Sequence, residues 1–244
     1  MLIVRRVAVL GAGTMGSRIA AHFANAGVPS LLLDLDAARA CAGIEAARKQ
    51  SPGGFFTDGA AALVKPGSFD ENLAEACNCD WVIEAVTEDL TIKRALWERV
   101  AGLAGEKTIL ATNTSGIPLR AIAEGFSESV QRRFLGTHFF NPPRYLHLVE
   151  VIPGPATDPA LIDSVSAYCE RTLGKGVVRC KDTPNFIANR IGSFFGSTVY
   201  KLMTEQDLSI EEVDALTGPL IGLPRSASFR LLDIVGLDVW AFVS

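Results

Sequence analysis

Short apolar runs alternate with helical patterns of apolar residues along most of the chain, from Val4 to about Asp182. The helical patterns place apolar residues three or four positions apart, as the buried face of a helix requires. The runs that predict strands cover residues 7–10, 31–33, 81–86, 108–111, 134–140, 146–152 and 177–178. Pro52 begins the one poorly periodic stretch, and from there to Phe69 we expect a loop or a short helical excursion. Strands that alternate with helices are typical of an α/β domain with a mostly parallel sheet.

The last quarter of the chain shows a different pattern, without predicted strands. Residues 186–204 predict one long helix, and Ser209 with Glu212 forms a capping box that opens another. We therefore expect an α/β domain over residues 1–183 and an all-helical segment over residues 184–244, which looks truncated.

The first predicted strand runs directly into the turn Gly11-Ala12-Gly13-Thr14-Met15-Gly16, and a helical pattern follows. Gly11 allows the tight turn, Gly13 lets a pyrophosphate approach the backbone, and Gly16 lets the helix pack close to the strand. Phosphates at this turn meet free N–H groups and the positive end of the helix dipole. The alternative is an ordinary strand-to-helix turn that is rich in glycine. The order of strand, turn and helix favours a Rossmann-type doubly wound sheet that binds a dinucleotide.

An acidic residue, Asp34, ends the second predicted strand, where its carboxylate can accept hydrogen bonds from a ribose diol. A carboxylate at this position repels the 2′-phosphate of NADP, so the sequence predicts NAD as the cofactor. Arg39 is nearby, but it lies beyond both Asp34 and Asp36, and we therefore do not assign it to a 2′-phosphate.

The composition is that of an ordinary globular protein, since 48% of the 244 residues are hydrophobic and 20% are charged. The formal net charge is −4 and no basic block occurs, which argues against a nucleic-acid partner. No apolar run of about 18 residues predicts a membrane span, and residues 1–6 lack the pattern of a signal peptide. The five cysteines complete no zinc-binding pattern, so we expect reduced thiols, no metal and a cytoplasmic protein.

Of the three histidines, His138 is the best placed for chemistry. It ends a predicted strand, and ligands of open α/β sheets bind beyond the carboxyl ends of the strands. Glu150 lies in the returning strand among apolar residues, where a carboxylate is costly to bury without a partner. The turn between the strands can bring Glu150 to His138, and such a pair suits a general base. The alternative is a structural glutamate bound by backbone amides; for His22 we expect packing or partial exposure.

Four further polar residues lie at the ends of predicted elements. Ser115 follows a strand, where its hydroxyl binds either a substrate oxygen or only the backbone of a turn or helix start. Glu88 and Lys93 frame the start of a helix, from which they reach a nicotinamide ribose unless they are plain surface residues. Asn189 lies on the long helix, where a buried amide needs a partner, either substrate or backbone.

These motifs together resemble the 3-hydroxyacyl-CoA dehydrogenase family. The matching segments run through nearly the whole chain in order: residues 11–16, Glu84-Ala85-Val86, Asn113-Thr114-Ser115, His138-Phe139-Phe140-Asn141-Pro142, Val149-Glu150-Val151-Ile152, Lys181-Asp182-Thr183-Pro184, Asn189-Arg190 and Val235-Gly236-Leu237-Asp238. The segments around His138 and Lys181 are specific to the family, whereas the glycine turn alone is not.

The resemblance implies an enzyme that oxidises an L-3-hydroxyacyl-CoA to the 3-ketoacyl-CoA with NAD, in fatty-acid β-oxidation. His138 would take the hydroxyl proton, Glu150 would orient His138, and Ser115 and Asn189 would hold the substrate oxygen and the imidazole. The cofactor would contact Gly11, Gly13, Thr14, Met15, Gly16, Asp34, Ala85, Val86 and Asn113, with Glu88, Lys93, Ser115 and Asn141 at its nicotinamide end. The implied partners are an acyl-CoA thioester and either a second copy bound through the helical segment or further C-terminal sequence.

The chain also departs from the family pattern. Asn185 stands where the family usually has glycine, residues 222–227 differ, and the region between Asp34 and Trp81 looks shorter than in small stand-alone members, where a helical hairpin helps to hold CoA. These departures favour a piece of a long protein that joins a dehydrogenase portion to an enoyl-CoA hydratase portion. Two alternatives stay open: a dehydrogenase of free hydroxy acids, with Arg144 as the carboxylate clamp, and a non-catalytic NAD-binding module.

Overall fold

A computed structural model of the chain describes residues 2–236. The chain forms two compact units, Met1–Thr183 and Pro184–Ser244, which divide where the pattern of alternating strands and helices stops. Within the described residues, no helix is both long enough and apolar enough to cross a membrane.

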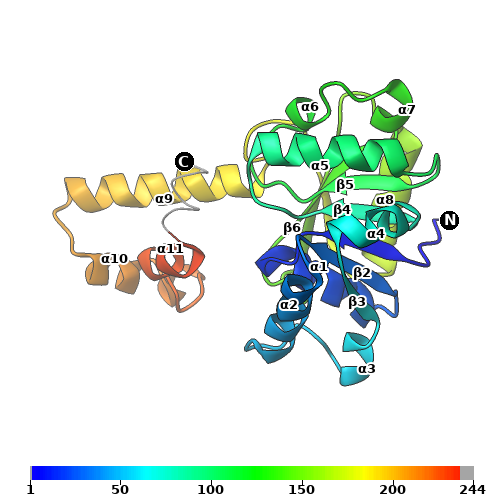
Figure 1. Cartoon of the computed structure of the whole chain (residues 1–244). Helices are drawn as coiled ribbons and strands as arrows, with labels where there is room; N and C mark the ends of the chain where they lie inside the picture. Colours follow the sequence, from blue (N-terminus) through cyan, green and yellow to red (C-terminus); the bar gives the residue numbers. More distant parts are fainter. Residues whose placement is uncertain (1, 237–244) are drawn as a thin grey trace. The chain divides into compact units, whose positions relative to one another are not determined.

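The first unit is built on one eight-stranded sheet with the strand order β3-β2-β1-β4-β5-β6-β7-β8. The strands are β1 (Val7–Leu10), β2 (Ser30–Asp34), β3 (Val64–Ser68), β4 (Trp81–Glu84), β5 (Ile109–Thr112), β6 (Phe134–Phe139), β7 (Leu148–Pro153) and β8 (Gly176–Arg179). Neighbouring strands are parallel except for β6 and β7. The predicted Rossmann-type doubly wound sheet is confirmed (Figure 1). The strand order reverses between β1 and β4, where sheets of this kind bind their ligands.

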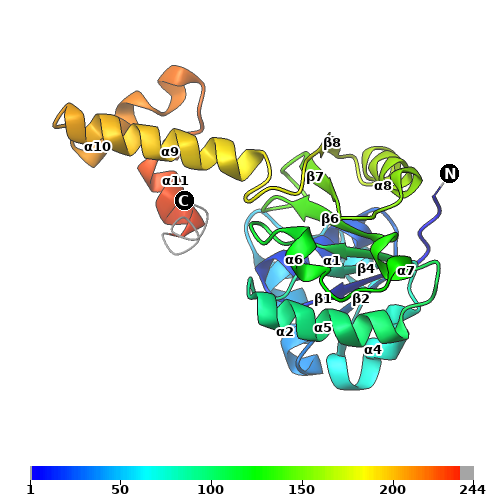
Figure 2. The same ribbon diagram turned by 90° about the horizontal axis from the view of Figure 1, so that it is seen from above.

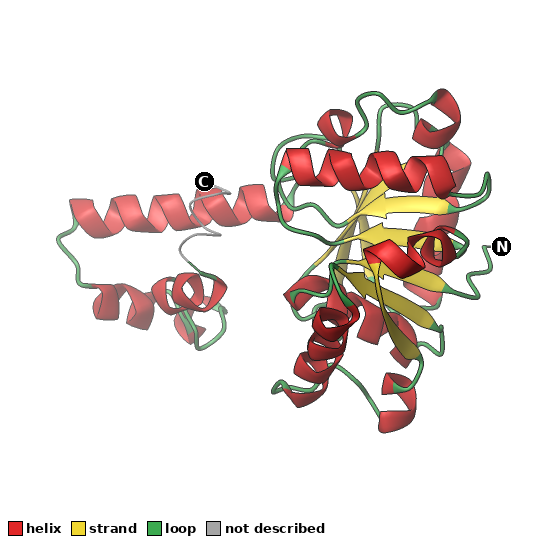
Figure 3. Cartoon of the chain, in the orientation of Figure 1, coloured by secondary structure: helices red, strands yellow, loops and turns green. Residues whose placement is uncertain are grey.

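Helices cover both faces of this sheet (Figure 3). They are α1 (Thr14–Asn25), α2 (Ala37–Lys49), α3 (Asp58–Ala61), α4 (Phe69–Cys77), α5 (Leu90–Leu103), α6 (Leu119–Ile122), α7 (Glu128–Gln131) and α8 (Pro159–Arg171). Side chains of Asp36, Ser68, Asp89 and Asp158 accept hydrogen bonds from first-turn amides of α2, α4, α5 and α8, which fixes where these helices begin. Viewed from above, α4 and α5 lie on one side of the sheet and α8 lies on the other (Figure 2).

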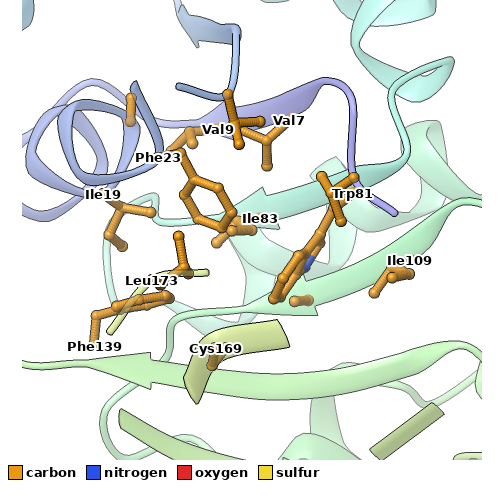
Figure 4. Close-up of a cluster of buried hydrophobic side chains, with 14 of the residues drawn as sticks. Val7, Val9, Ile19, Phe23, Trp81, Ile83, Ile109, Phe139, Cys169 and Leu173 are labelled. Atoms are coloured by element: carbon orange, nitrogen blue, oxygen red, sulfur yellow. The ribbon is translucent and has the colours of Figure 1, made fainter. Parts of the chain in front are cut away.

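An aromatic cluster forms the centre of the core on the α1 and α8 side of the sheet (Figure 4). The ring centroids of Phe23 and Trp81 are 5.5 Å apart, and those of Trp81 and Tyr168 are 6.0 Å apart. On the opposite side, Trp97 of α5 packs on Phe134 of β6 with a centroid distance of 5.1 Å. Because side chains alternate across a strand, Phe134 and His138 share the α5 side while Phe139 faces α1.

The structure corrects one expectation about the sheet. The stretch after Pro52 contains α3 and the strand β3, whereas the sequence pattern predicts only a loop or a short helix there. Pro66 weakens the strand pattern, but β3 is an edge strand, where a residue without an N–H is tolerated. Gly67 permits a close approach, since a Cβ atom on it would lie 2.7 Å from Leu33 Cδ2.

The second unit is all helical in its described part, as expected. It contains α9 (Ala188–Glu205), α10 (Ile210–Leu216), a 3-10 turn (Pro219–Ile221) and α11 (Phe229–Val235). The predicted capping box of Ser209 and Glu212 is present at the start of α10. The long helix begins at Ala188 rather than Phe186, because Asn185 and Phe186 have positive φ angles of 62° and 47°. Asparagine tolerates this left-handed conformation, which explains how it stands where glycine is usual. Leu237 and Asp238 lie outside the described residues.

His22 is a buried histidine of α1, in line with the packing role expected for it. Its Nε2 lies 3.0 Å from the carbonyl oxygen of Leu173, which follows α8. Burial, together with the positive charge of Lys175, lowers the pKa of His22 to about 4. The imidazole is therefore neutral in the folded protein at neutral pH.

We predict that His22 destabilises the fold in acid. Because its folded pKa is depressed, the unfolded chain binds the proton more tightly, and stability falls as the pH drops from about 6.5 towards 4. From pH 7.5 to pH 5 this effect amounts to about 2 kcal/mol. The measurement is the free energy of unfolding in urea at pH 7.5 and at pH 5. Between these pH values, the His22→Gln variant should lose about 2 kcal/mol less of this free energy than the parent chain. Equal losses for the two proteins would contradict the assignment.

Candidate active site

The turn between β1 and α1 needs its three glycines for different reasons. Gly11 has a φ of 103°, and a Cβ atom on it would lie 2.7 Å from the carbonyl oxygen of Ala85. A Cβ atom on Gly16 would lie only 1.7 Å from the carbonyl oxygen of Gly11, so α1 packs directly against the end of β1. Gly13 has no neighbour within 4 Å of a built Cβ atom. Two glycines therefore serve the packing of the turn, and the third leaves its backbone open to a ligand.

Asp34 joins the end of β2 to this turn. Its Oδ2 accepts a hydrogen bond of 2.7 Å from the amide of Ala12, and its Oδ1 accepts one of 2.8 Å from the amide of Leu35. Carboxylate oxygens have further acceptor capacity beyond one bond each. Asp34 therefore fixes the turn and still presents an acceptor to the cleft that it lines.

A cleft of about 640 Å³ follows the carboxyl ends of β1, β2, β4 and β5. Of the residues expected to bind a cofactor, the following line it: Gly11, Gly13, Thr14, Met15, Asp34, Ala85, Val86, Glu88, Asn113 and Ser115. A second cleft of about 380 Å³ shares Gly13, Thr14, Asp34 and Arg39 with the first and continues between α1 and α2. Arg39, for which no contact with a 2′-phosphate is predicted, lines both clefts.

Three of the expected cofactor residues do not line the larger cleft. Gly16 and Lys93 are buried, and Lys93 is only 1% exposed, which excludes the surface position considered for it. Asn141 is exposed and accepts a hydrogen bond from Arg18, a residue of the second cleft. The position of Gly16 agrees with its expected role in packing the helix.

Glu88 is the polar residue that fixes the loop after β5. Its Oε1 accepts hydrogen bonds from the amides of Ser115 and Gly116, at 2.8 Å and 3.0 Å, and from the hydroxyl of Thr114. Lys93 Nζ lies 3.1 Å from its Oε2. Burial alone would raise the pKa of Glu88, but Lys93 and these hydrogen bonds outweigh burial and lower it. Glu88 is thus a carboxylate that holds Ser115 beside the cleft.

Lys93 is held by a second carboxylate, Glu84, which lies at the end of β4. Lys93 Nζ is 2.6 Å from Glu84 Oε1, and the Glu84 side chain is completely buried. Glu84 Oε1 also accepts from the amide of Val86 at 2.9 Å, and its Oε2 accepts from the hydroxyl of Thr112 at 2.7 Å. In the sequence, Glu84 stands out only as part of the segment Glu84-Ala85-Val86 within the predicted strand 81–86, and no role is predicted for it.

His138 and Glu150 meet as the sequence predicts. They are directly opposite each other in the antiparallel pair β6–β7, and His138 Nδ1 lies 2.8 Å from Glu150 Oε2. His138 is 5% exposed and Glu150 is fully buried. The side-chain partner of Glu150 is therefore the imidazole, so a glutamate bound by backbone amides alone is excluded.

Two polar side chains, Asn113 and Lys175, secure the end of this hairpin. Asn113, which lines the larger cleft, accepts a hydrogen bond of 2.9 Å from the amide of Phe139, next to His138. Lys175 is buried and donates to the carbonyl oxygens of Pro143 and, at 2.9 Å, Leu146 in the turn between β6 and β7. Burial lowers the pKa of Lys175 to about 8. Asn113 thus connects the cleft to the His138 strand, and Lys175 ties down its turn.

The remaining candidates lie elsewhere. Asn189 is the second residue of α9, in the helical unit, and is half-buried. Arg144 donates to the carbonyl oxygens of Gly53 and Phe55, at 2.7 Å and 2.9 Å, and its guanidinium lies over the Phe56 ring. Arg144 therefore links its own loop to the loop of residues 53–56, which argues against a role as a carboxylate clamp.

Within residues 2–236, no group of His, Cys, Asp or Glu side chains is arranged to hold a metal ion.

Comparison with known families agrees with this geometry. The sequence profile of "3-hydroxyacyl-CoA dehydrogenase, NAD binding domain" matches residues 6–183, and that of "3-hydroxyacyl-CoA dehydrogenase, C-terminal domain" matches residues 186–244. A Deinococcus radiodurans protein named "Probable 3-hydroxyacyl-CoA dehydrogenase" is 45% identical over 99% of this chain and 72% of its own length. A Bacillus subtilis protein of the same name is 42% identical, and the match spans 99% of this chain and 33% of that protein.

Solved structures give the same result. M. tuberculosis FadB2 superimposes with a TM-score of 0.88 at 30% identity, over 99% of this chain and 86% of that one. The 3-hydroxybutyryl-CoA dehydrogenase of Escherichia coli K12 superimposes with a TM-score of 0.86 at 32% identity, over 99% of this chain and 52% of that one. At these identities the similarity covers sequence as well as fold.

We predict that alanine at Gly13 separates folding from cofactor binding. Since a Cβ atom there meets nothing in the protein, the free energy of unfolding should fall by no more than about 1 kcal/mol. The methyl group enters the space that a pyrophosphate needs, so NADH binding, measured by fluorescence titration, should weaken by at least about tenfold.

Two other glycines provide the controls. Gly102 of α5 is also open around its Cβ position, and Gly102→Ala should leave NADH binding unchanged. Gly16→Ala should unfold the protein or destabilise it strongly, because its Cβ atom would overlap the carbonyl oxygen of Gly11. Full NADH affinity in the Gly13→Ala variant would show that the ligand does not approach this backbone.

Proposed function

Because the chain belongs to the 3-hydroxyacyl-CoA dehydrogenase family of NAD-dependent oxidoreductases, we propose that it oxidises an L-3-hydroxyacyl-CoA to the 3-ketoacyl-CoA, as a step of fatty-acid β-oxidation. The observation that carries this proposal is the buried pair of His138 and Glu150 at the carboxyl end of β6. The pair provides a proton acceptor on the strand next to β5, whose end lines the dinucleotide cleft.

His138 is the proposed general base. A carboxylate accepts hydrogen bonds, so the contact with Glu150 Oε2 leaves the hydrogen on His138 Nδ1 and makes Nε2 the nitrogen that takes the hydroxyl proton. Glu150 holds the plane of the ring and stabilises the imidazolium that forms. Burial of both side chains limits competition from water for these contacts.

The glycine turn and Asp34 are the proposed cofactor-binding groups. The open backbone at Gly13 and the first-turn amides of α1 suit a pyrophosphate, and Asp34 suits the ribose of the adenosine end. When bound, NAD supplies the acceptor for the hydride that leaves the substrate. With the adenosine end at Asp34, the nicotinamide end is proposed to lie on the side of Glu88, Asn113 and Ser115, and the order of the strand ends supports this.

The loop after β5 is the proposed link between cofactor and substrate. Ser115 and Asn189 are proposed to hold the substrate oxygen and the imidazole, and the amides of Ser115 and Gly116 are fixed by Glu88. Lys93 is a positioning residue rather than a contact, because it is buried between two carboxylates.

A thioester substrate is favoured over a free hydroxy acid. A free acid would need a cation to bind its carboxylate, and the contacts of Arg144 with Gly53, Phe55 and the Phe56 ring use that candidate for structure. An acyl-CoA needs no such clamp at its reacting end.

Pairing of the helical unit with a second copy is also part of the proposal. Exposed apolar residues of α9, such as Ile191, Phe194 and Tyr200, support it.

We predict that His138→Gln abolishes most oxidation without loss of the cofactor. A general base contributes about 10²–10⁴-fold, and turnover of L-3-hydroxybutyryl-CoA should fall within that range. NADH binding, followed by fluorescence, should stay within about twofold of the parent because His138 does not line the cleft. Glu150→Gln should give a smaller loss of turnover. Unchanged turnover in His138→Gln would remove this residue from the mechanism.

A substrate comparison tests the reaction itself. With NAD⁺, the protein should reduce the cofactor in the presence of L-3-hydroxyacyl-CoA thioesters and not with free 3-hydroxybutyrate, as followed by NADH absorbance. NADP⁺ should be a poor replacement, because the carboxylate of Asp34 repels a 2′-phosphate. Faster turnover of the free acid would overturn the proposed substrate class, whereas NADH binding without any turnover would favour a non-catalytic module.

A further inference from the structure

A buried charge cluster lies under one end of the dinucleotide cleft. It consists of Glu84, Lys93 and Glu88, with Lys93 Nζ 2.6 Å from Glu84 Oε1 and 3.1 Å from Glu88 Oε2. Glu84 and Lys93 are 0% and 1% exposed, and the Glu88 side chain is 25% exposed. Two carboxylates and one ammonium leave the cluster with one net negative charge.

Both oxygens of Glu84 face donors, as suits an ionised carboxylate. Lys93 and the amide of Val86 donate to Oε1, and the hydroxyl of Thr112 donates to Oε2. The Thr112 oxygen itself accepts from the amide of Thr114 at 3.2 Å, so its hydrogen is available for Glu84. Glu84 is therefore held as an acceptor on every side.

The loop after β5 does not bind this second carboxylate directly. The neutral pair of Lys93 and Glu88 is enough to hold the Ser115 and Gly116 amides, since these amides bind Glu88 and not Glu84. Burying a charge needs a compensating partner, and here one ammonium faces two carboxylates. Glu84 therefore gives the cluster a negative charge that Lys93, which also pairs with Glu88, does not balance.

The position of the cluster under the cleft suggests a function for its negative charge. Val86 and Glu88 line the cleft at the end far from Asp34 in the order of strands, together with Ser115. In the proposed function this is the nicotinamide end. The nicotinamide ring carries a positive charge in the oxidised cofactor and none in the reduced cofactor, so a nearby fixed charge distinguishes the two forms.

We propose that Glu84 sets the preference of this protein between oxidised and reduced NAD, by giving the Glu84–Lys93–Glu88 cluster a net negative charge beside the nicotinamide ring. This inference rests on the orientation of the cofactor in the proposed function. Glu84 touches neither cofactor nor substrate and acts through its field.

The test is Glu84→Gln, which keeps the shape of the side chain and an acceptor oxygen but makes the cluster neutral. Dissociation constants of the full chain for NAD⁺ and for NADH are measured separately by isothermal titration calorimetry. The affinity for NAD⁺ should fall relative to that for NADH on the order of tenfold. An equal loss of both affinities would mean that Glu84 is structural only, and would overturn the proposal.

Two control variants separate charge from structure. Thr112→Val removes a hydrogen bond to the same carboxylate without changing its charge, and should leave the ratio of the two affinities unchanged. Glu75→Gln changes the net charge of the chain by the same amount, but Glu75 of α4 pairs with Arg6, before β1, and with Lys65 of the edge strand β3. It too should leave the ratio unchanged, and a shifted ratio in either control would contradict the proposed role of Glu84.

Glu88→Gln provides a second measurement if Glu84→Gln does not fold. It neutralises the same cluster at its partly exposed member, so the NAD⁺ to NADH ratio should shift in the same direction. A folded Glu88→Gln variant with the parent ratio would overturn the inference. Absence of binding of either cofactor form by the parent chain would instead contradict the proposed function.

Discussion

The close approach of α1 to the end of β1 is the constraint on which the rest of the site depends. Gly16 packs against the carbonyl oxygen of Gly11 at a distance that leaves no room for a side chain. This contact points the first amides of α1 into the space beyond the strand ends, where the positive end of the helix dipole is available to an anion. Asp34 then fixes the same turn from the neighbouring strand through the Ala12 amide. The cleft exists because these contacts hold the turn open at Gly13.

Much of this arrangement is predictable from the sequence because it rests on local patterns. The glycine spacing, the acid at the end of β2 and the capping box at Ser209 each report one physical requirement of one element. The pairing of His138 with Glu150 is also predictable, since a hairpin brings back a residue only 12 positions away. Where an element depends on contacts between residues close in sequence, the sequence pattern predicts both the element and its buried face.

Other features depend on contacts that no local pattern reports. Strand β3 has a proline and a glycine where a strand usually has apolar residues, and it forms because β2 offers a free edge. Lys93 looks like a surface residue of α5, but two carboxylates from different segments make its burial possible. Arg144 looks like a ligand-binding cation, yet carbonyl oxygens of a distant loop take its hydrogen bonds. In each case the partner is far along the chain, and the sequence alone does not identify it.

Strand β7 runs antiparallel to β6, so the two strands form a hairpin that needs no crossover helix. The His138–Glu150 contact closes a short loop, whereas the cleft needs contacts such as Glu84–Thr112 and Asn113–Phe139, at separations of 28 and 26 residues. Loop-closure entropy grows with loop length, and contacts between parallel strands also need the intervening crossover helices. The His138–Glu150 pair can therefore form early in folding as a local hairpin, before the cofactor cleft is complete. Mutations that slow the docking of the crossover helices would then delay completion of the cleft more than formation of this pair.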